Sequence, residues 1–498
     1  MLRPWKLSIS IARDSDVPIH VQIAEKIIEE IQYGRFIPGT VLPGTREFSK
    51  SLNINRKTVV QAYDTLVAQG WLTTENKRGT FVSGRAFALS HHAKHPKPAA
   101  IKLAKRPHQL PEALIQSTSL NKKQDGYDLS EDIPDSRLLP FEALSRTMRR
   151  ALVSGVRHNK LHYQDAAGAK ILREAVMQMV NLELGLYAEL GQVCITRGGQ
   201  MAVHLAAKLL VGQDDCVAVE TLCNPLVNEM LVGMGAKVLR VKHGHEGVDL
   251  ESFETLCINH PVSVLYVSPQ HQIPTGVVMS MENRKGLLKL AEKYDVVIIE
   301  DDSHGNFCFG PQITPPLASL DKSGRVIYIG SLSRLLAPGL RLGYLVSTQE
   351  FVRHLANQIA QIDRHGNTLT ELAVAELMLS GELKRHNLKV HKIYFDRRVH
   401  LLNLINQQLS FYCTPAPSSH GLSIWLNIFQ HVDIQNLLLF AEKEKLRIIP
   451  SSLYTENRHY TNGLRLCFGH LDHEEITDLI YRLKSVFIKS QSERLLSA

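Results

Sequence analysis

The N-terminal quarter of the chain carries apolar residues at helical spacing. Residues 17–33 repeat an isoleucine at every fourth position, which predicts an amphipathic helix that ends at Gly34. These isoleucines are Ile19, Ile23, Ile27 and Ile31. Thr45 is expected to cap a second, short helix that buries Phe48 and Leu52. The chain therefore begins with a pair of short helices.

A third helix and a hairpin follow this pair. Strand patterns at residues 71–74 and 80–82 flank the basic turn 76–79, which predicts a β-hairpin. Asn55 is expected to cap a helix that runs to Gly70, with an apolar face formed by Val59, Ala62, Tyr63, Leu66 and Val67. Helix, helix, turn, helix and basic hairpin is the order of an α+β winged helix-turn-helix domain.

From about residue 128 the pattern changes to apolar runs of strand length separated by helical stretches. The clearest runs are Val217–Val219, Val264–Val267, Val296–Ile299 and Val326–Ile329. Such alternation predicts an α/β fold with a mainly parallel sheet covered by helices on both faces. Ligands in these folds bind outside the carboxyl ends of the strands. The candidate site loops are therefore residues 220–225, 268–276, 300–303 and 331–341.

Positive charge is concentrated in the first quarter of the chain. Residues 1–125 hold 19 Lys and Arg against 10 Asp and Glu, whereas the remainder holds 38 against 39. A basic end on a neutral body indicates a polyanionic partner, most simply double-stranded DNA, with a solvated tail as the alternative. Residues 85–123 carry eight Lys or Arg and four prolines. They predict an extended linker that either adds phosphate contacts or serves as a plain tether.

Cysteine usage and hydropathy narrow the cellular setting. The seven cysteines include no CxxC pair, which favours a reducing compartment and argues against a disulfide framework or a zinc site. No run of about 18 apolar residues exists, so no membrane partner is expected. We expect a cytoplasmic protein.

The helix-turn-helix pattern also identifies candidate DNA contacts. The second helix of such a motif lies in the major groove with its first side chains against base edges. Here those side chains belong to Arg56, Lys57, Thr58 and Gln61. Lys77 at the tip of the hairpin can reach phosphates or the minor groove. Gly79 permits the turn and a close approach of the backbone.

Four motifs in this region resemble the GntR family of bacterial regulators. They are Leu42–Phe48, Asn55–Tyr63, Gly70–Leu72 and Gly79–Val82. The resemblance implies that Arg46, Arg56 and Gly79 contact DNA. The alternative for Arg46 is that it pairs with Glu47 or another local acid on a solvated face.

The rest of the chain resembles class I aminotransferases of fold type I, which use pyridoxal phosphate (PLP). The motifs that carry the resemblance are Tyr163–Gly168, Thr196–Gln200, Pro269–Gly276, Glu300–Asp302, Ser331–Tyr344 and Gly463–Leu466. The resemblance implies that Gly199 and Gln200 meet the cofactor phosphate, that Arg341 binds it, and that Asp301 faces the pyridine nitrogen. It further implies site residues at Tyr163, His271, Ser331 and Arg465, where Arg465 grips a substrate carboxylate. The alternative for Arg465 is that it pairs within the small domain.

Three positions depart from the family pattern. Arg334 stands where the family has the Schiff-base lysine, Ser303 where a tyrosine contacts the ring oxygen, and Asn224 where an aromatic ring stacks on the cofactor. A guanidinium stays protonated and is a poor nucleophile, so Arg334 cannot form a Schiff base. PLP is therefore expected to be non-covalent or lost. Arg334 either pairs with Asp301 at a dead site, or binds a different anion, or accompanies non-covalent PLP.

A GntR head fused to such a body is the architecture of the MocR subfamily. We expect a DNA-binding domain in residues 1–84, a basic linker in 85–123 and an aminotransferase-like domain in 124–498, with its small-domain part in about 375–498. Three arginines favour a small anionic ligand, namely Arg334, Arg341 and Arg465. We expect a transcriptional regulator whose body forms a homodimer and senses a small anionic metabolite. The alternatives are a PLP-dependent aminotransferase with an accessory DNA-binding head, and a body that only dimerises.

Overall fold

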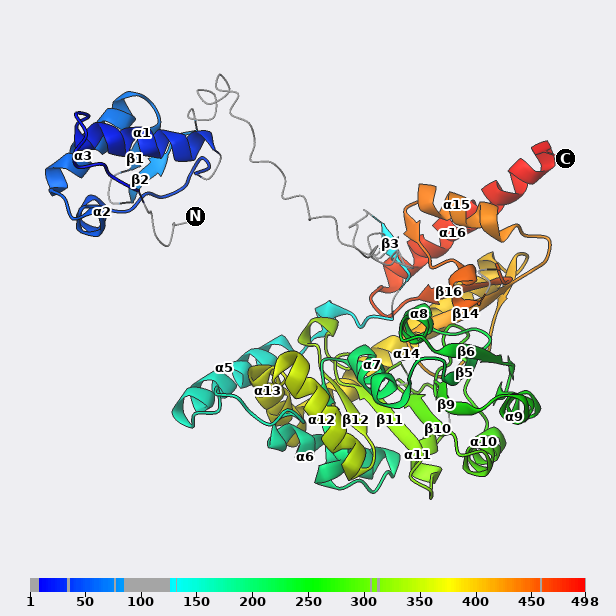
Figure 1. Ribbon diagram of the computed structural model, residues 1–498. Coiled ribbons are helices and arrows are strands. Elements are labelled where there is room, and N and C mark those ends of the chain that lie inside the picture. Colours follow the sequence, from blue (N-terminus) through cyan, green and yellow to red (C-terminus); the bar gives the residue numbers. More distant parts are fainter. Residues whose placement is uncertain are drawn as a thin grey trace. The chain divides into compact units, whose positions relative to one another are not determined.

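The structure, a computed structural model, describes most of the chain in two compact units, Met1–Glu112 and Ala113–Ala498 (Figure 1). The described residues are 9–33, 36–75, 78–84, 126–130, 132–304, 307–310, 314–456 and 459–497. We call the described part of the first unit the head and that of the second the body. The linker predicted for residues 85–123 lies outside the described residues. None of the helices in these ranges is long and apolar enough to cross a membrane.

The head contains three helices followed by a hairpin, as the sequence predicts. Its elements are α1 Ile19–Gln32, α2 Thr45–Leu52, α3 Arg56–Ala68, β1 Leu72–Glu75 and β2 Gly79–Val82. β1 and β2 pair antiparallel. The isoleucines of α1 pack with Val59, Ala62, Tyr63 and Leu66 of α3, and with Phe48 and Leu72, in one core. Val67, predicted for the same face of α3, is 37% exposed and lies outside this core, so that part of the prediction is wrong. The α+β winged helix-turn-helix prediction is confirmed.

The caps of the head helices are partly as predicted. Asn55 caps α3, because its Oδ1 accepts the backbone N–H of Lys57 at 2.9 Å. Thr45, however, does not cap α2, and the prediction for it is wrong. Gly44 occupies the cap position in an extended conformation, and Thr45 is the first residue of the helix. The Thr45 hydroxyl instead accepts a hydrogen bond from Arg56.

Seven strands form the central sheet of the body, in the order β4, β12, β11, β10, β9, β5, β6. Their bounds are β4 Val193–Thr196, β5 Cys216–Glu220, β6 Lys237–Val241, β9 Val262–Val267, β10 Val297–Asp301, β11 Val326–Ser331 and β12 Gly343–Val346. The five strands from β6 to β11 pair in parallel, and β12 is antiparallel to both of its neighbours. The predicted mainly parallel sheet is confirmed, and the four apolar runs lie in β5, β9, β10 and β11, apart from Val296, which directly precedes β10.

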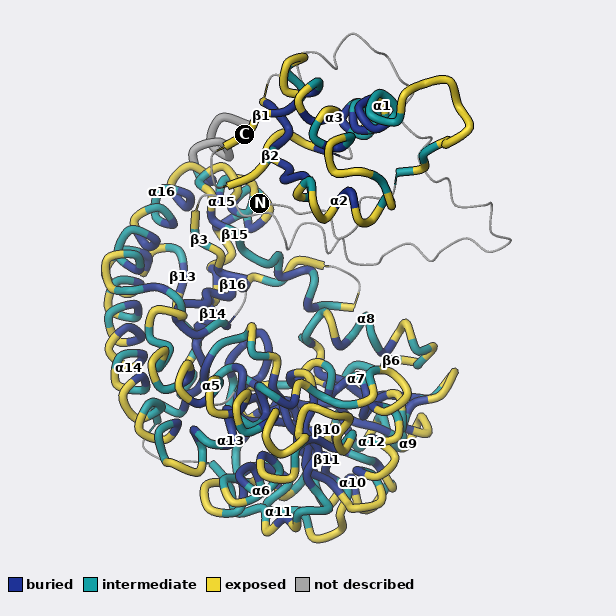
Figure 2. Tube along the Cα trace, turned by 90° about the vertical axis from the view of Figure 1, so that its left-hand side faces the viewer, coloured by how far each residue is buried: buried dark blue, intermediate teal, exposed yellow. Residues whose placement is uncertain are grey.

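Helices cover both faces of this sheet. Successive strand residues point to opposite sides, so a strand that is apolar throughout presents apolar side chains to both helix layers. On one face Val264 and Tyr266 pack with residues of α7 and α12. On the other, Leu265 and Val267 pack with residues of α9 and α10. These helices and their neighbours are α7 Gly199–Leu210, α8 Pro225–Gly233, α9 Leu250–Asn259, α10 Met281–Lys293, α11 Leu317–Leu320 and α12 Gln349–Asp363. Figure 2 shows the buried strands β10 and β11 between these layers.

Three further helices cover the edge of the sheet at β4 and β12. They are α5 Phe141–Arg157, α6 Lys170–Met179 and α13 Thr368–Leu379. Leu172 and Val176 of α6 pack against Tyr344 of β12 in one buried cluster, which also includes Leu144 of α5 and Val374 of α13. The short strands β7 His243–Gly244 and β8 Gly247–Val248 form a separate hairpin.

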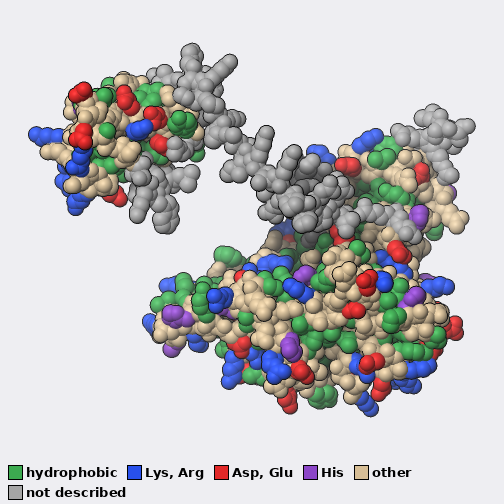
Figure 3. Space-filling model, viewed as in Figure 1, with side chains coloured by type: hydrophobic (Ala, Val, Ile, Leu, Met, Phe, Trp, Pro, Cys, Tyr) green, Lys and Arg blue, Asp and Glu red, His purple; other side chains and the backbone are tan. Residues whose placement is uncertain are grey.

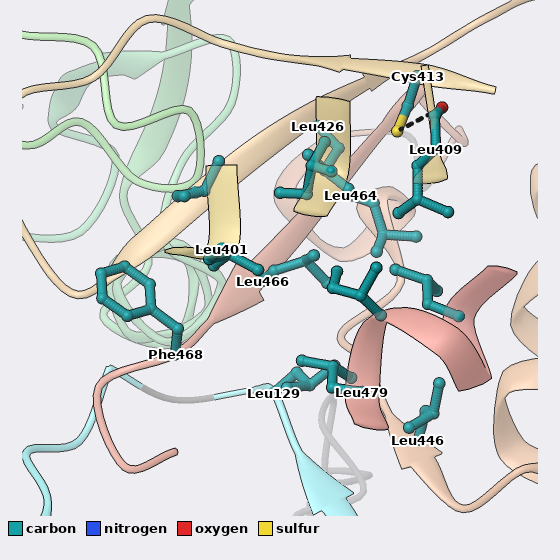
Figure 4. Packing of buried hydrophobic residues seen from close by; sticks show 14 of the residues in the cluster. Leu129, Leu401, Leu409, Cys413, Leu426, Leu446, Leu464, Leu466, Phe468 and Leu479 are labelled. Atoms are coloured by element: carbon teal, nitrogen blue, oxygen red, sulfur yellow. Dashed lines mark hydrogen bonds between the residues drawn. The ribbon is translucent and has the colours of Figure 1, made fainter. Parts of the chain in front are cut away.

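A second sheet of three antiparallel strands completes the body. Its elements are β13 Cys413–Pro415, β14 Ser423–Ile428 and β16 Gly463–Cys467, covered by α14 Glu382–Gln408, α15 Ile434–Lys443 and α16 His473–Ser497. We call these elements the small-sheet layer. Their leucines pack into one cluster that includes Leu129, from the start of the body (Figure 4). There β3 Tyr127–Asp128 pairs in parallel with β15 Leu446–Arg447, so the body begins on the small-sheet layer.

Candidate functional site

The first turn of α3 presents a guanidinium held in place by α2. Arg56 is exposed, and its Nε donates to the Oγ1 atom of Thr45 at 3.2 Å. This bond uses Nε alone, and the two terminal Nη groups of Arg56 have no hydrogen bond to the described residues. Arg56, Lys57 and Gln61 line a shallow hollow along the solvent face of α3. Two parallel N–H donors suit the guanine edge, so this geometry can read a base in the major groove.

The other predicted DNA contacts are surface residues of the same head. Lys and Arg side chains gather on the side of the head where α2 and α3 lie (Figure 3). Arg46, Lys57, Gln61 and Gly79 are exposed, and Thr58 is half-buried. The ion pairs of the described head are Lys26–Glu29 and Arg78–Glu75, so no ion pair joins Arg46 to Glu47 there. Gly79 has a φ of 122°, which accounts for the glycine at the turn. Lys77 lies outside the described residues.

In the body, one group of predicted residues meets at the N-terminus of α7. Gly198 precedes this helix with a φ of 87° and offers no side-chain cap. The Arg341 guanidinium lies beside it, donating from Nη2 to the carbonyl of Arg197 at 2.9 Å. A Cβ atom built at Gly343 would lie 2.5 Å from the carbonyl carbon of Gly198, so only glycine allows this approach. Free backbone N–H groups and an adjacent arginine make an anion site.

Ser303 links this turn to Asp301. A Cβ atom built at Gly199 would lie 2.8 Å from the Cβ of Ser303, so the two residues are in contact. The buried Asp301 carboxylate accepts the Ser303 hydroxyl at 2.6 Å and its N–H at 3.0 Å. Its other oxygen accepts the hydroxyl of Tyr266 at 2.7 Å. Gly199, Ser303, Asp301 and Arg341 therefore form one group, which we call the strand-end cluster.

Asp302, the next residue, points elsewhere and accepts the Tyr328 hydroxyl at 2.6 Å. Burial raises the pKa of Asp302 to about 8, although the Tyr328 bond opposes this shift. The two consecutive carboxylates thus differ in environment. Of these two carboxylates, only that of Asp301 belongs to the strand-end cluster.

A second group surrounds Arg465. Its Nη2 donates to Asp132 Oδ2 at 2.5 Å, and both side chains are buried. The same carboxylate oxygen lies 3.3 Å from His304 Nδ1 and 3.3 Å from the Ser423 hydroxyl. His271, also predicted as a site residue, hydrogen-bonds Ser423 from Nε2 at 3.1 Å. We call these five residues the Arg465 cluster.

Burial and pairing fix the charges of this cluster. Burial alone would raise the pKa of Asp132, but Arg465 and His304 hold it well below its usual range. Burial alone would lower the pKa of Arg465, but Asp132, Cys467 and Tyr454 together outweigh it and raise that pKa. Burial lowers the pKa of His271 to about 3 and that of His304 below its usual value. At neutral pH the cluster therefore holds one anion, one cation and neutral imidazoles.

The remaining predicted residues are placed as follows. Asn224 caps α8 by accepting the N–H of Leu226 at 3.1 Å. Arg334 is half-buried, and its backbone N–H donates to the hydroxyl of Ser331 at 3.3 Å. The three interpretations of the Arg334 guanidinium stay predictions. Gln200 is exposed. Tyr163 is 77% exposed and packs near Arg364 and His365 on the surface.

Sequence reasoning missed three side chains that shape these groups. Tyr266 reaches Asp301 from the neighbouring strand, and the register between β9 and β10 is invisible in a linear pattern. His304 directly follows the predicted loop 300–303, and extending that loop by one residue would have included it. Asp132 lies in a stretch without periodicity, and its pairing with Arg465 spans 333 positions. No local signal identifies it.

The residues of the body fit the phosphate end of PLP and do not fit covalent attachment of its aldehyde. The N-terminus of α7 with Arg341 fits a phosphate group. Arg334 offers no amine that could attach an aldehyde. The body therefore has residues that would hold a phosphate, and position 334 cannot provide covalent attachment.

Two family profiles match the chain: aminotransferase class I and II over residues 128–483, and bacterial regulatory proteins of the gntR family over residues 19–82. The chain is 26% identical over 494 residues to the probable rhizopine catabolism regulatory protein MocR of Rhizobium meliloti, with 96% of each chain covered. The chain belongs to the aminotransferase class I and II family and, with its GntR head, to the MocR subfamily.

Other relatives agree with this membership of the MocR subfamily. The chain is 27% identical over 451 residues to an uncharacterized HTH-type transcriptional regulator, YjiR, of Escherichia coli strain K12, covering 89% of this chain and 93% of that one. The GntR head implies DNA binding.

Solved aminotransferases share the fold of the MocR-type body. The kynurenine aminotransferase of Pyrococcus horikoshii, solved in complex with PMP, superposes with a TM-score of 0.68 at 25% identity, covering 75% of this chain and 93% of that one. LysN, an α-aminoadipate aminotransferase of Thermus thermophilus, gives 0.68 at 25% identity, covering 73% and 92%. The fold-type I body predicted from the sequence is confirmed.

Proposed function

We propose that this protein is a transcriptional regulator that binds double-stranded operator DNA and whose body senses a small anionic metabolite as a homodimer, without covalent PLP. The observation that carries the proposal is the combination of a retained anion site at α7 with an arginine at position 334. Arg341 and the free N–H groups of α7 offer binding without chemistry. A body that binds but cannot form a Schiff base is suited to sensing.

Exposed apolar side chains on α5 support dimerisation. Phe141, Leu152, Val153 and Val156 are between 45% and 71% exposed. Residues 152, 153 and 156 share one face of the helix, and hydrophobic side chains reach the surface where α5 lies (Figure 3). Grouped exposed apolar residues mark association surfaces. Sedimentation should give a dimer for the wild type and a monomer for Val156→Glu, whereas Ile258→Glu, at a similarly exposed site on α9, should remain a dimer.

The sensing proposal is tested by binding. Inorganic phosphate should raise the melting temperature of the full chain, because a ligand that binds only the folded state stabilises it. The effect should be lost in Arg341→Ala and kept in Arg353→Ala, which removes an exposed arginine of α12. A panel of phosphate monoesters should then contain a compound that changes the affinity for operator DNA. If no anion stabilises the wild type, and Arg341→Ala regulates normally, the body only dimerises.

A further inference from the structure

Arg465 already has an anion bound to it, and that anion is part of the chain. Asp132 reaches β16 from the segment that follows β3, and its side chain is 3% exposed against 6% for Arg465. Their contact joins Oδ2 to Nη2 at 2.5 Å. A carboxylate from solution that binds Arg465 must therefore either displace Asp132 or share the guanidinium with a second negative charge.

Both routes are unfavourable for a free carboxylate. The Arg465 cluster holds no net charge, because Asp132 balances Arg465 and its imidazoles are neutral. A second carboxylate would add one negative charge in excess to these five largely buried residues, and taking such a charge out of water is unfavourable. Displacement is opposed by the tether, since a covalently attached carboxylate competes at an effective concentration of about millimolar or more.

A neighbouring pair offers an internal comparison. Asp135 and Arg397 are 3% and 6% exposed and joined by a 2.8 Å contact. Asp135 is fully engaged: its Oδ1 also accepts the N–H and the Nε of Arg137. The arginine Nε has no hydrogen-bond partner among the described residues in either pair, but in the Arg465 cluster Asp132 Oδ1 and His271 Nδ1 also have none. The Asp135 pair has a saturated carboxylate, whereas the Asp132 pair retains buried polar atoms that a ligand can engage.

We propose that Asp132 is an intramolecular carboxylate that occupies Arg465 and thereby determines ligand class: the body binds phosphate compounds at α7 and rejects free carboxylates. The phosphate half of this statement rests on the proposed sensing function. The rejection of carboxylates rests on the Asp132–Arg465 contact alone. Asp132 is thus a specificity-determining residue.

The experiment measures binding of succinate and of inorganic phosphate to the full chain by calorimetry and melting. Wild-type protein should respond to phosphate and not to succinate. Asp132→Gly removes the internal carboxylate and should bind succinate at least about tenfold more tightly than the wild type, a difference of about 1.4 kcal/mol. The double variant Asp132→Gly/Arg465→Gln should lose that gain. Asp135→Asn, which breaks the comparison pair, should lose stability without gaining succinate binding.

Distinct outcomes separate the two proposals. If phosphate has no effect while Asp132→Gly gains succinate binding, the sensing function fails and the role of Asp132 stands. Wild-type protein that binds succinate as tightly as Asp132→Gly, or a folded Asp132→Gly variant that gains nothing, overturns that role. If Asp132→Gly does not melt cooperatively, Asp132→Asn decides, because it removes the charge and keeps the shape.

Discussion

Arg56→Ala provides the sharpest test of the DNA-reading surface. The Thr45 contact engages only Nε of Arg56, and a bidentate bond from arginine to guanine contributes about 1–3 kcal/mol of discrimination. Loss of that bond corresponds to about 5-fold to about 150-fold weaker operator binding. Binding to an unrelated duplex should change much less, because one charge among many is removed.

The Thr45 contact predicts a second, smaller effect. Thr45→Val keeps the shape of the side chain and removes the hydroxyl that accepts from Arg56 at 3.2 Å. A net hydrogen bond contributes about 0.5–1.5 kcal/mol, and this one is exposed, so about twofold weaker operator binding is expected. Lys50→Ala is a suitable control, because Lys50 is an exposed basic residue at the end of α2. It should leave base preference unchanged.

The assay is fluorescence anisotropy of the full chain on a labelled operator obtained by in vitro selection, with a scrambled duplex alongside. Both duplexes are titrated at several salt concentrations, because affinity for DNA depends strongly on salt. Equal operator affinities for wild type and Arg56→Ala would refute the placement of α3 in the major groove. Equal losses on both duplexes would make Arg56 a phosphate contact rather than a base contact.

Three further predictions follow from single contacts. Asn55→Ala removes the cap of α3 and should lower the unfolding free energy of the head by about 1 kcal/mol in urea denaturation. Asn55→Gly should lower it by only about a few tenths of a kcal/mol. Equal effects of the two variants would contradict the capping role. Added PLP should leave no borohydride-stable adduct on the peptide containing Arg334, as mass spectrometry can establish; transamination would contradict this. Asp302 keeps its proton to about pH 8 when folded, whereas the unfolded chain releases it near pH 4. The resulting stabilisation is complete below about pH 4 and lost as the pH rises through 8. Asparagine has no proton to release, so Asp302→Asn should lose less stability than the wild type between about pH 6 and about pH 9 in urea denaturation.

The fold could be predicted from the sequence because its patterns are local. Isoleucines four apart identified α1, and apolar runs bounded by polar loops identified β5, β9, β10 and β11. The Thr45 cap failed for an equally physical reason. Its hydroxyl has two possible partners, and the one it takes, Arg56, lies eleven positions away.

The candidate site was predictable only in part. Motifs placed Gly199, Ser303 and Arg341 near one another, since each follows a strand of the same sheet. The partner of Arg465 was not predictable, because the side chain that neutralises it lies 333 positions earlier in the sequence, near the first described residues of the body. Residue type suggested an anion-binding arginine, and only the tertiary structure reveals that its anion is Asp132.

The pairing of β3 with β15 decides where mechanical tension on the chain enters the body. A pull from the N-terminal side is borne first by the N–H groups of Tyr127 and Leu129, which donate to Lys445 and Arg447 at 3.1 and 2.9 Å. Asp132 lies only three residues beyond this anchorage. The described body therefore begins on the layer that contains Arg465, so a slight tilt of the small sheet would move Tyr127 and Leu129 directly.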